Sequence, residues 1–403
     1  MKFSKPRAAL AALLFLTVCG GLAAYFKYKK VSNYVISQIS GQAAKRLGRQ
    51  VKFGHISFSP LSGVVIEDAC VSRKPDFSKG DFFCAAKTII KPEFAALMKN
   101  RIYFSKVTFE HPVMKVRESK GVWDFADLIA LLPQTDKGLY LTWNASELVM
   151  TDAALEAEMG TSGLSMTLEH AALRLTHYSS YGGNYGLSAS GLLKSALKGK
   201  LLQAEVGLEA DANFDYGGLS STKGVFTARN AAFGAITLQG LRAGWSVFNV
   251  RKPLAEKNYS LSLEAEQLLI PGAENSVRAG VSKGLELFSA VAGRTAPKIE
   301  DIEVPELKAA LTLKDSVLYV KDVSMRANFL NLDASLRIDG PAKKADAEVK
   351  AETGGHSLGL SASGPMSAPE IKPLMSSALA ARLKDALAGI ESGLLKFFPV
   401  TGD

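Results

Sequence analysis

Length and composition place this chain among folded proteins: 47% of its 403 residues are hydrophobic, which excludes general disorder and allows two or three ordinary domains. The 35 glycines, with an aromatic content of only 8%, favour a turn-rich β protein. The net charge of +9 suits nucleic acid or anionic lipid headgroups, but no nucleic-acid-binding motif accompanies it, so we predict no nucleic-acid partner. We interpret most of the lysines as solvating polar faces.

An uninterrupted apolar run extends from Ala8 to Phe26, between the basic segments KFSKPR and KYKK. As a helix this run would be about 29 Å long, which matches the hydrocarbon thickness of a bilayer. We therefore predict a cytoplasmic tip and a transmembrane anchor in residues 1–30, with the remaining chain on the exported side. A cleaved signal peptide is the alternative, since residues 21–23 (GLA) fit a cleavage site, but the long run and its basic flank favour a retained anchor.

Residues 31–138 are expected to form one module of a helix, strands and short helices. An amphipathic helix that ends around Gly48 is predicted by apolar residues at intervals of four, namely Val31, Val35, Ile39, Ala43 and Leu47. Extended patterns follow, with Ile56 and Phe58 on one face of the first strand. Short helices are predicted after Pro92 and in GVWDFADLIALLP, and two strands hinged at His111-Pro112 lie between them.

Two cysteines, Cys70 and Cys84, lie in the segment predicted to be exported. A disulfide between them would close a loop of about 15 residues, worth roughly 3 kcal/mol in the chain-entropy model, and an oxidising compartment would permit it. Two buried free thiols are the alternative. The residues leave this choice open.

From residue 139 onward, apolar and polar side chains alternate in almost every segment. We divide this part into a middle β region, 139–280, and a C-terminal β module, 281–372, in which SKGLELFSAVAGR suggests a brief helix. Successive side chains of a strand leave opposite faces, so each such strand should have one apolar and one polar face. The cleanest apolar files are Val206, Leu208, Ala210, Ala212 and Phe214 in one segment and Leu330, Leu332, Ala334, Leu336 and Ile338 in another.

An apolar sheet face must be covered, and two arrangements can cover it. Two sheets can pack face to face, so that the alternating leucines form an ordinary core. Alternatively, the sheet stays open and its apolar face holds a hydrophobic ligand. On the residues alone we favour the closed sandwich.

The last segment, residues 373–403, is predicted to be an amphipathic helix and tail. One helical face carries Leu379, Leu383, Leu387, Ile390, Leu394 and Phe397. Such a helix can cap the sheet or lie on a membrane surface.

One short motif resembles a catalytic one. Residues 355–359 read GHSLG, which fits the nucleophile elbow of lipases and esterases. That chemistry needs a strand before the serine, a helix after it, and a histidine later in the chain, and no histidine follows His356. The remaining histidines are scattered without metal-ligand spacing, and no pair of carboxylates stands out for acid–base work. We therefore predict no catalytic residue, no cofactor and no metal.

Three segments together resemble the AsmA family. They are KNRIYFSKVTFEHPVMKVRESKGVWDFADLIALLP, the upstream RQVKFGHISFSPLSGVVIEDACV that follows a membrane anchor, and VPELKAALTLKDSVLYVKDVSMRANFLNLDASLRIDG with its continuation to SGPMSAPEIKP. The likeness brackets the chain from about Ala8 to Pro373. It is a pattern of residue types that contains no catalytic residues.

The resemblance implies a mainly β fold: an N-terminal transmembrane helix, then an elongated, curved β-sheet groove with a few short helices and a C-terminal amphipathic helix. It implies a single-pass protein of a bacterial inner membrane, with most of the chain in the periplasm. Its expected partners are phospholipids or other acyl lipids held in the groove. Its expected role is to support the lipid homeostasis of the outer membrane. With the resemblance we favour the open groove, lined by Leu330, Leu332, Ala334, Leu336, Ile338, Val206, Leu208, Ala210, Phe214, Ile56 and Phe58.

A second function hypothesis belongs to a different class. Exposed strand edges can act as templates for pairing with other chains. On this reading the protein is a non-enzymatic assembly or scaffold factor for outer-membrane proteins or envelope complexes.

Overall fold

The computed structural model confirms a mainly β protein. It describes residues 45, 47–59, 63–93, 103–129, 134–135, 138–139, 145–177, 183–197, 199–215, 218–272, 282–283, 286, 289, 299–353 and 356–374. In these stretches no helix has the length and apolar character that a membrane crossing requires. The predicted anchor at residues 8–26, the helical turn after Pro92 and the C-terminal helix lie outside them.

Contacts divide the chain into two compact units. Unit 1 comprises residues 1–132 and 143–161, and unit 2 comprises residues 133–142 and 162–403. The sequence-based boundary at 138/139 thus differs from the main division, which falls at 161/162. Each unit is described separately.

Unit 1 contains seven strands, a 3-10 turn (η1, Phe77–Lys79) and a short helix (α3, Ala126–Ile129). The strands are β1 (Val51–Lys52), β2 (Ile56–Ser59), β3 (Gly63–Ser72), β4 (Asp81–Pro92), β5 (Phe104–Ser119), β6 (Val122–Trp123) and β9 (Glu147–Met159). β1 and β2 both pair with β3, and β3, β4 and β5 form an antiparallel meander. β9 then pairs parallel to β5, and the long connection between them, which includes α3, is of the kind that parallel pairing requires.

The two strands predicted around His111-Pro112 are one strand, β5. The left-handed backbone of His111 (φ 50°) stands where the hinge was expected. His111 is an irregular residue within β5, but it does not end the pairing, since both Glu110 and Pro112 keep partners on β4.

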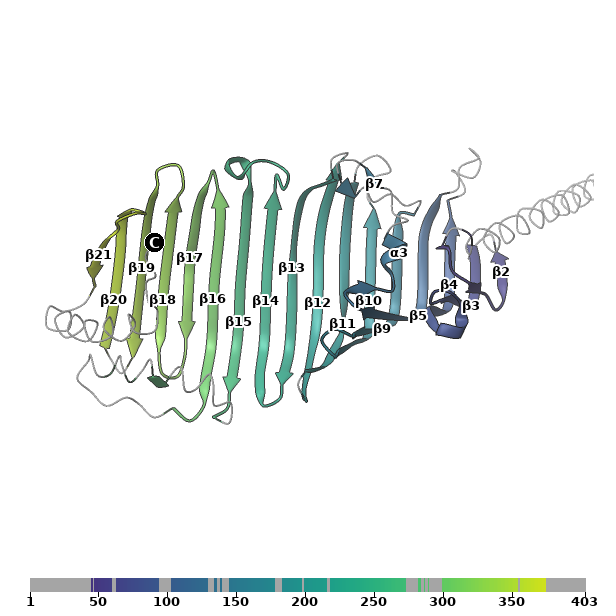
Figure 1. Ribbon diagram of the computed structural model, residues 1–403, viewed down its shortest axis with the longest axis horizontal. Coiled ribbons are helices and arrows are strands. Elements are labelled where there is room, and N and C mark those ends of the chain that lie inside the picture. Colours follow the sequence, from purple (N-terminus) through teal and green to yellow (C-terminus); the bar gives the residue numbers. More distant parts are fainter. Residues whose placement is uncertain are drawn as a thin grey trace, which may run out of the picture. The chain divides into compact units, whose positions relative to one another are not determined.

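Unit 2 contains a row of twelve strands in which each strand pairs antiparallel with the next along the chain (Figure 1). They are β10 (Leu164–His177), β11 (Gly183–Leu197), β12 (Lys200–Asp215), β13 (Gly218–Phe233), β14 (Ile236–Phe248), β15 (Asn258–Ile270), β16 (Ile302–Lys314), β17 (Val317–Arg326), β18 (Asn331–Asp339), β19 (Lys344–Thr353), β20 (His356–Pro365) and β21 (Glu370–Pro373). A 3-10 turn, η2 (Leu254–Glu256), and a two-stranded ribbon of β7 (Gln134–Thr135) and β8 (Gly138–Leu139) complete the described elements of the unit. β21 pairs only with β20 among the described strands, so the row is an open sheet at that end.

Polar doublets interrupt the alternation in several long strands, and each places one residue in the left-handed region. In unit 2 these residues are His170 on β10, Asn230 on β13, Gln267 on β15 and Asp322 on β17, with φ values of 49°, 50°, 52° and 53°. The extra residue shifts the alternation by one position, so that apolar side chains on both sides of the doublet leave the same face. On β15, for example, Ala265 and Leu268 pair with Leu241 and Leu238 of β14.

Candidate functional site

The register of unit 2 aligns its alternating strands into one apolar face. Following the paired residues from β10 to β21 gives an uninterrupted row with one apolar residue or glycine per strand. We call this row the central rung: Leu175, Leu187, Ala210, Gly224, Trp245, Leu261, Leu311, Val320, Leu336, Ala347, Ala362 and Ile371. At about 4.8 Å per strand, it extends across about 53 Å.

Neighbouring rows repeat the pattern on the same side. Val206, for example, begins a row that continues through Ala228, Leu241, Ala265, Leu307, Met325, Leu332, Ala351 and Leu358. We call the whole surface that carries these rows the apolar face. Its opposite is the polar face.

The apolar face is not sealed like the core of a sandwich. Large side chains of the face remain exposed, including Leu261 at 48%, Val349 at 41%, Leu360 at 45% and Ile371 at 66%. In the described stretches of unit 2 the only other sheet is the ribbon of β7 and β8, with two residues in each strand. That ribbon is far too small to cover twelve strands.

Most residues predicted to line a groove lie on this face. Val206, Leu208, Ala210 and Phe214 on β12, and Leu332, Ala334, Leu336 and Ile338 on β18, share it and are half-buried. Leu330 precedes β18, outside the strand. Ile56 and Phe58 belong to unit 1, where they pack against the buried Val64, Ile66 and Ala69. The structure therefore places these last two in a small core.

Sequence reasoning identified Phe214 but missed the other aromatic rings of the apolar face, those of His177, Tyr185 and Trp245. His177 stacks on Tyr185 with 4.7 Å between ring centroids, and Tyr185 meets Phe214 edge-on at 5.5 Å. Trp245 lies over Gly224, where an added Cβ would come within 2.4 Å of the indole. A glycine opposite an aromatic residue is the signal that could have indicated this pair. That signal can be recognised only when the register between β13 and β14 is known.

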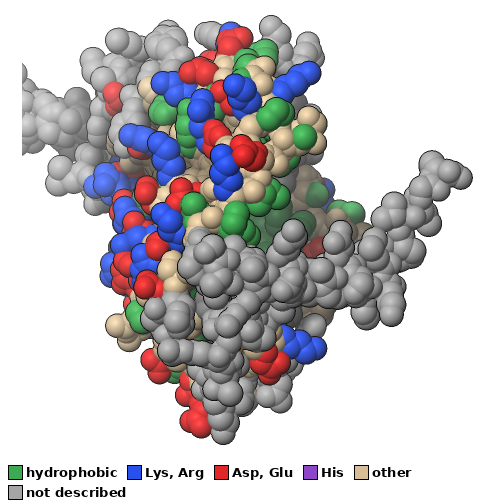
Figure 2. All heavy atoms as spheres, turned by 90° about the vertical axis from the view of Figure 1, so that its left-hand side faces the viewer, with side chains coloured by type: hydrophobic (Ala, Val, Ile, Leu, Met, Phe, Trp, Pro, Cys, Tyr) green, Lys and Arg blue, Asp and Glu red, His purple; other side chains and the backbone are tan. Residues whose placement is uncertain are grey.

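The polar face is covered with ion pairs. Some join neighbouring strands, such as Lys194 with Glu169 and Lys223 with Asp211. Others join positions i and i+2 of one strand, such as Lys350 with Glu348, because the period of two brings such residues to the same side. In Figure 2, which looks onto the β21 end, charged side chains gather at the left of the view and hydrophobic side chains show nearer its centre.

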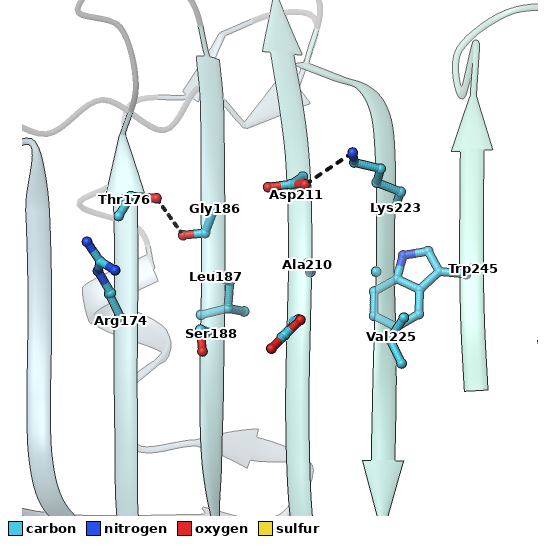
Figure 3. A pocket seen from close by; sticks show the side chains of 12 residues that line it. Arg174, Thr176, Gly186, Leu187, Ser188, Ala210, Asp211, Lys223, Val225 and Trp245 are labelled. Carbon is cyan, nitrogen blue, oxygen red and sulfur yellow. Dashed lines mark hydrogen bonds and ion pairs between the residues drawn. The ribbon is translucent and has the colours of Figure 1, made fainter. Parts of the chain in front are cut away.

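One hollow, with a volume of about 520 Å³, lies over β10 to β14 (Figure 3). Most of the residues that line it belong to the polar face, and Leu187, Ala210, Gly224 and Trp245 of the central rung also contribute. Arg174, Ser188, Glu209, Asp211 and Lys223 surround it, and the Lys223–Asp211 pair crosses its rim. It is open to solvent and ringed by charges, so an acyl chain would gain little there. We therefore place the candidate site on the apolar face.

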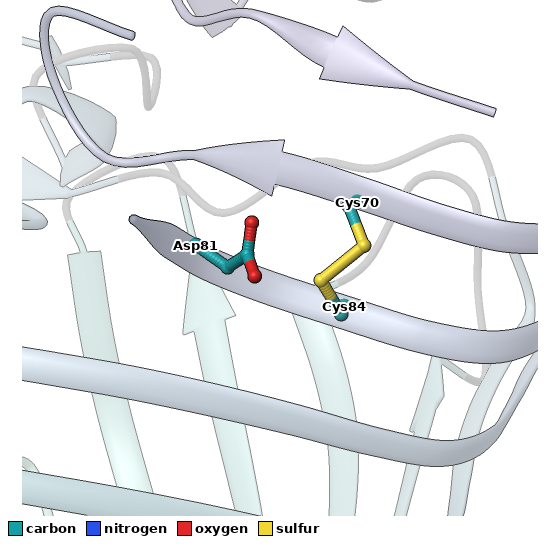
Figure 4. A group of neighbouring side chains, drawn as sticks. All are labelled: Cys70, Asp81 and Cys84. Carbon is teal, nitrogen blue, oxygen red and sulfur yellow. A yellow bond between two sulfur atoms is a disulfide. The ribbon is translucent and has the colours of Figure 1, made fainter. Parts of the chain in front are cut away.

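A disulfide joins Cys70 of β3 to Cys84 of β4, which are directly paired residues (Figure 4). The carboxylate of Asp81 lies near both sulfur atoms. Metal ligation by cysteine needs thiolates, and sulfur atoms bonded to each other are not thiolates. We therefore interpret the three side chains as a covalent cross-link beside an acidic residue.

A buried arginine holds α3 of unit 1 against the strands. Arg49 has no exposed side-chain surface; its guanidinium contacts Asp127 at 2.7 Å and donates to the carbonyl oxygen of Ser72 at 3.2 Å. The same group lies 4.3 Å from the ring centroid of Phe82. Lys74 contacts the other oxygen of Asp127 at 2.9 Å. This carboxylate is thus held between two cations.

The stability of unit 1 should depend on acid pH through Asp127. Its hydrogen bond with Arg49, followed by the one with Lys74, lowers the pKa of Asp127 from 3.8 to about 2. A depressed folded-state pKa contributes stability above the unfolded value and loses it as pH falls through the folded value. We expect about 2 kcal/mol to be lost between pH 4 and pH 2, and Asp127→Asn to flatten that part of the urea-denaturation profile. An unchanged profile in the variant would contradict this assignment.

The GHSLG segment does not form a nucleophile elbow. Ser357 is the second residue of β20, and strand β20 continues to Pro365 with no helix in between. Ser357 pairs with Glu352 in the ladder with β19. A strand-to-helix turn that would raise the serine above a sheet is therefore missing at this position.

Comparison of the chain with protein-family models, with curated proteins and with solved structures found no match in any of the three.

Proposed function

We propose that this protein is an inner-membrane-anchored, periplasmic lipid-binding and transfer protein of the AsmA family, and that the apolar face of unit 2 forms a groove for phospholipid acyl chains. The observation that carries the proposal is the central rung. Twelve successive strands each contribute an apolar residue or glycine to one row, and the side chains of that row are left partly exposed.

The energetics of an acyl chain fit such a surface. Each methylene transferred from water to an apolar environment contributes about 0.8 kcal/mol, and this gain needs no fixed polar partner. A surface without interruption lets a chain move along it at nearly constant free energy, because each step exchanges one set of apolar contacts for another. A row of apolar contacts, without a single deep pocket, is what transport of a lipid tail requires.

The sequence supports the location. The apolar run from Ala8 to Phe26 predicts a membrane anchor that precedes the strands in the sequence. Such an anchor would hold the chain at a donor membrane, from which lipids can enter the groove.

The test uses a photoreactive amino acid, p-benzoylphenylalanine, in place of Leu336 in the full-length protein in its native membrane. Leu336 is on the central rung, and its neighbour Arg337 is exposed on the polar face, which makes position 337 the matched control. Irradiation should produce phospholipid adducts at position 336 and none above background at 337, read by mass spectrometry. Equal adducts at both positions, or none at 336, would refute a lipid-binding face.

A scaffold function is favoured by one observation. All four residues of β21 are exposed, and β21 is the terminal strand of the row. An exposed edge strand offers unpaired backbone groups to another chain. Photoreactive residues on β21 that yield protein adducts, in place of lipid adducts at position 336, would support this second function.

A further inference from the structure

Cys70, Cys84 and Asp81 bring three possible metal ligands together in unit 1. The two sulfur atoms and a carboxylate oxygen all lie within 4.8 Å of one another (Figure 4). Within the described stretches, this is the one group of three or more histidine, cysteine or acidic side chains that lie this close. The group shares no residue with the apolar face of unit 2.

A β-bulge brings Asp81 to the side of the disulfide. In a regular strand, Asp81 and Cys84 would leave opposite faces, because they are three positions apart. The register of β4 against β3 shifts between Val71 and Ser72, so that Phe82 of β4 is an extra residue. The extra residue shifts the alternation by one position and turns Asp81 to the face of Cys84. Bulges next to functional sites re-aim side chains in this way.

The carboxylate of Asp81 is available to a cation. Its side chain is exposed, and no hydrogen bond or ion pair with another described residue engages its carboxylate. The contact of Arg73 with this residue goes to the backbone carbonyl oxygen, which accepts from Nε at 3.3 Å. A metal ion would therefore not have to displace another partner of the carboxylate.

Reduction of the disulfide would free both sulfur atoms without separating the strands. Ladder pairs on both sides, Ala69 with Ala85 and Val71 with Phe83, hold β3 and β4 together independently of the sulfur atoms. Ligand atoms of a tetrahedral zinc site are about 3.5–3.8 Å apart, given zinc–sulfur bonds of about 2.3 Å. Three ligand atoms that already lie within 4.8 Å of one another can reach this separation by rotation of their side chains.

We propose that unit 1 binds one Zn²⁺ when its disulfide is reduced, through the sulfur atoms of Cys70 and Cys84 and the carboxylate of Asp81. A dithiol reductant supplies two electrons and two protons: the bond between the sulfur atoms breaks, two thiols form, and the reductant becomes a disulfide. Zn²⁺ then displaces both thiol protons and binds the two thiolates beside the carboxylate. Soft thiolates favour Zn²⁺ over Mg²⁺ and Ca²⁺, and three protein ligands leave a fourth position for water.

The experiment uses the full-length protein with Cys19→Ala, so that Cys70 and Cys84 are its only cysteines. The protein is reduced with tris(2-carboxyethyl)phosphine, freed of the reductant without air, and titrated with Co²⁺. Thiolate-to-cobalt absorption should appear in the reduced protein, and Zn²⁺ should abolish it at one ion per chain. The oxidised protein should show no such absorption and no zinc uptake.

A pair of variants in the same background tests the third ligand. Asp81→Asn keeps both cysteines and should lower the zinc affinity of the reduced protein by about tenfold or more, since even a residue that only orients a metal ligand contributes that much. The matched control, Glu67→Gln, removes an exposed carboxylate of β3 that lies outside the group. It should leave the zinc affinity unchanged.

Three results would overturn the proposal. Equal zinc affinities of the reduced Asp81→Asn protein and its parent would show two thiols acting without the carboxylate, which is also the result expected if reduction unfolds unit 1. Absence of zinc uptake by the reduced protein, or equal uptake by the oxidised protein, would exclude the site as well. Lipid adducts at position 336 are a separate measurement, so the failure of either proposal leaves the other in place.

Discussion

Replacing Leu332 and Leu336 together with aspartate should abolish lipid binding while the protein stays folded. Both residues are half-buried on the apolar face, where two carboxylates would meet acyl methylenes with no cation to pair with. We expect the amount of co-purifying phospholipid, measured by mass spectrometry against protein, to fall by about tenfold or more. Neither side chain lies in a sealed core, so the loss of unfolding free energy should stay below about 2 kcal/mol.

The matched control lies on the same strand. Asn331→Asp with Ser335→Asp adds the same two charges to the polar face of β18, where both positions are exposed. Lipid content should be unchanged in this variant. A fully unfolded Leu332→Asp/Leu336→Asp protein would show instead that these leucines form a packed core, and equal lipid loss in both variants would point to a general effect of charge.

Replacing Arg49 with methionine should be the most destabilising single change in unit 1. The substitution removes a guanidinium with no exposed side-chain surface and leaves Asp127 with only the partly exposed Lys74 as a cationic partner. Breaking a buried ion pair from one side costs about 3–5 kcal/mol, because the remaining charge and the freed carbonyl of Ser72 lose their partner. Urea denaturation of the purified protein carrying Trp143→Phe and Trp245→Phe, which leaves Trp123 beside α3 as its one tryptophan, measures the loss by fluorescence.

Two further variants show whether the buried charge is the cause. Adding Asp127→Leu to Arg49→Met should recover part of the stability, since no unpaired carboxylate then remains. Arg337→Met on the polar face breaks exposed pairs with Asp339 and Asp346 and should cost about 1 kcal/mol or less. An Arg49→Met protein as stable as Arg337→Met would contradict the role given to Arg49.

Period-two alternation correctly assigned a mainly β fold and the shared face of Leu332 and Leu336, because a side chain's direction in a strand depends on local geometry alone. The same reasoning divided β5 at His111-Pro112, where the strand is continuous. A polar doublet such as Glu110-His111 breaks the alternation. Its residue types alone do not distinguish a bulge within one strand from a boundary between two strands. Pairing with β4 decides, since hydrogen bonds on both sides of the irregular residue keep the strand together.

The role of Arg49, by contrast, could not be predicted from the sequence. Nothing near it in the sequence distinguishes it from the other basic residues of KRLGRQ, because its partners Ser72 and Asp127 are 23 and 78 positions away. Likewise, the alternating pattern that placed Ile56 and Phe58 on one face could not tell a small core from an open surface. Burial depends on what lies opposite, and that is a property of the folded chain.

The sequence by itself determined which side of each strand is apolar, because the covalent geometry of an extended chain sends neighbouring side chains in opposite directions. Only the tertiary structure decided that these sides meet in register across twelve strands and that no described sheet of matching size closes over them. Hairpin order and hydrogen-bond register determine whether the apolar sides meet, and whether a second sheet lies opposite them depends on the folded chain, because alternation within a strand carries no information about its neighbours.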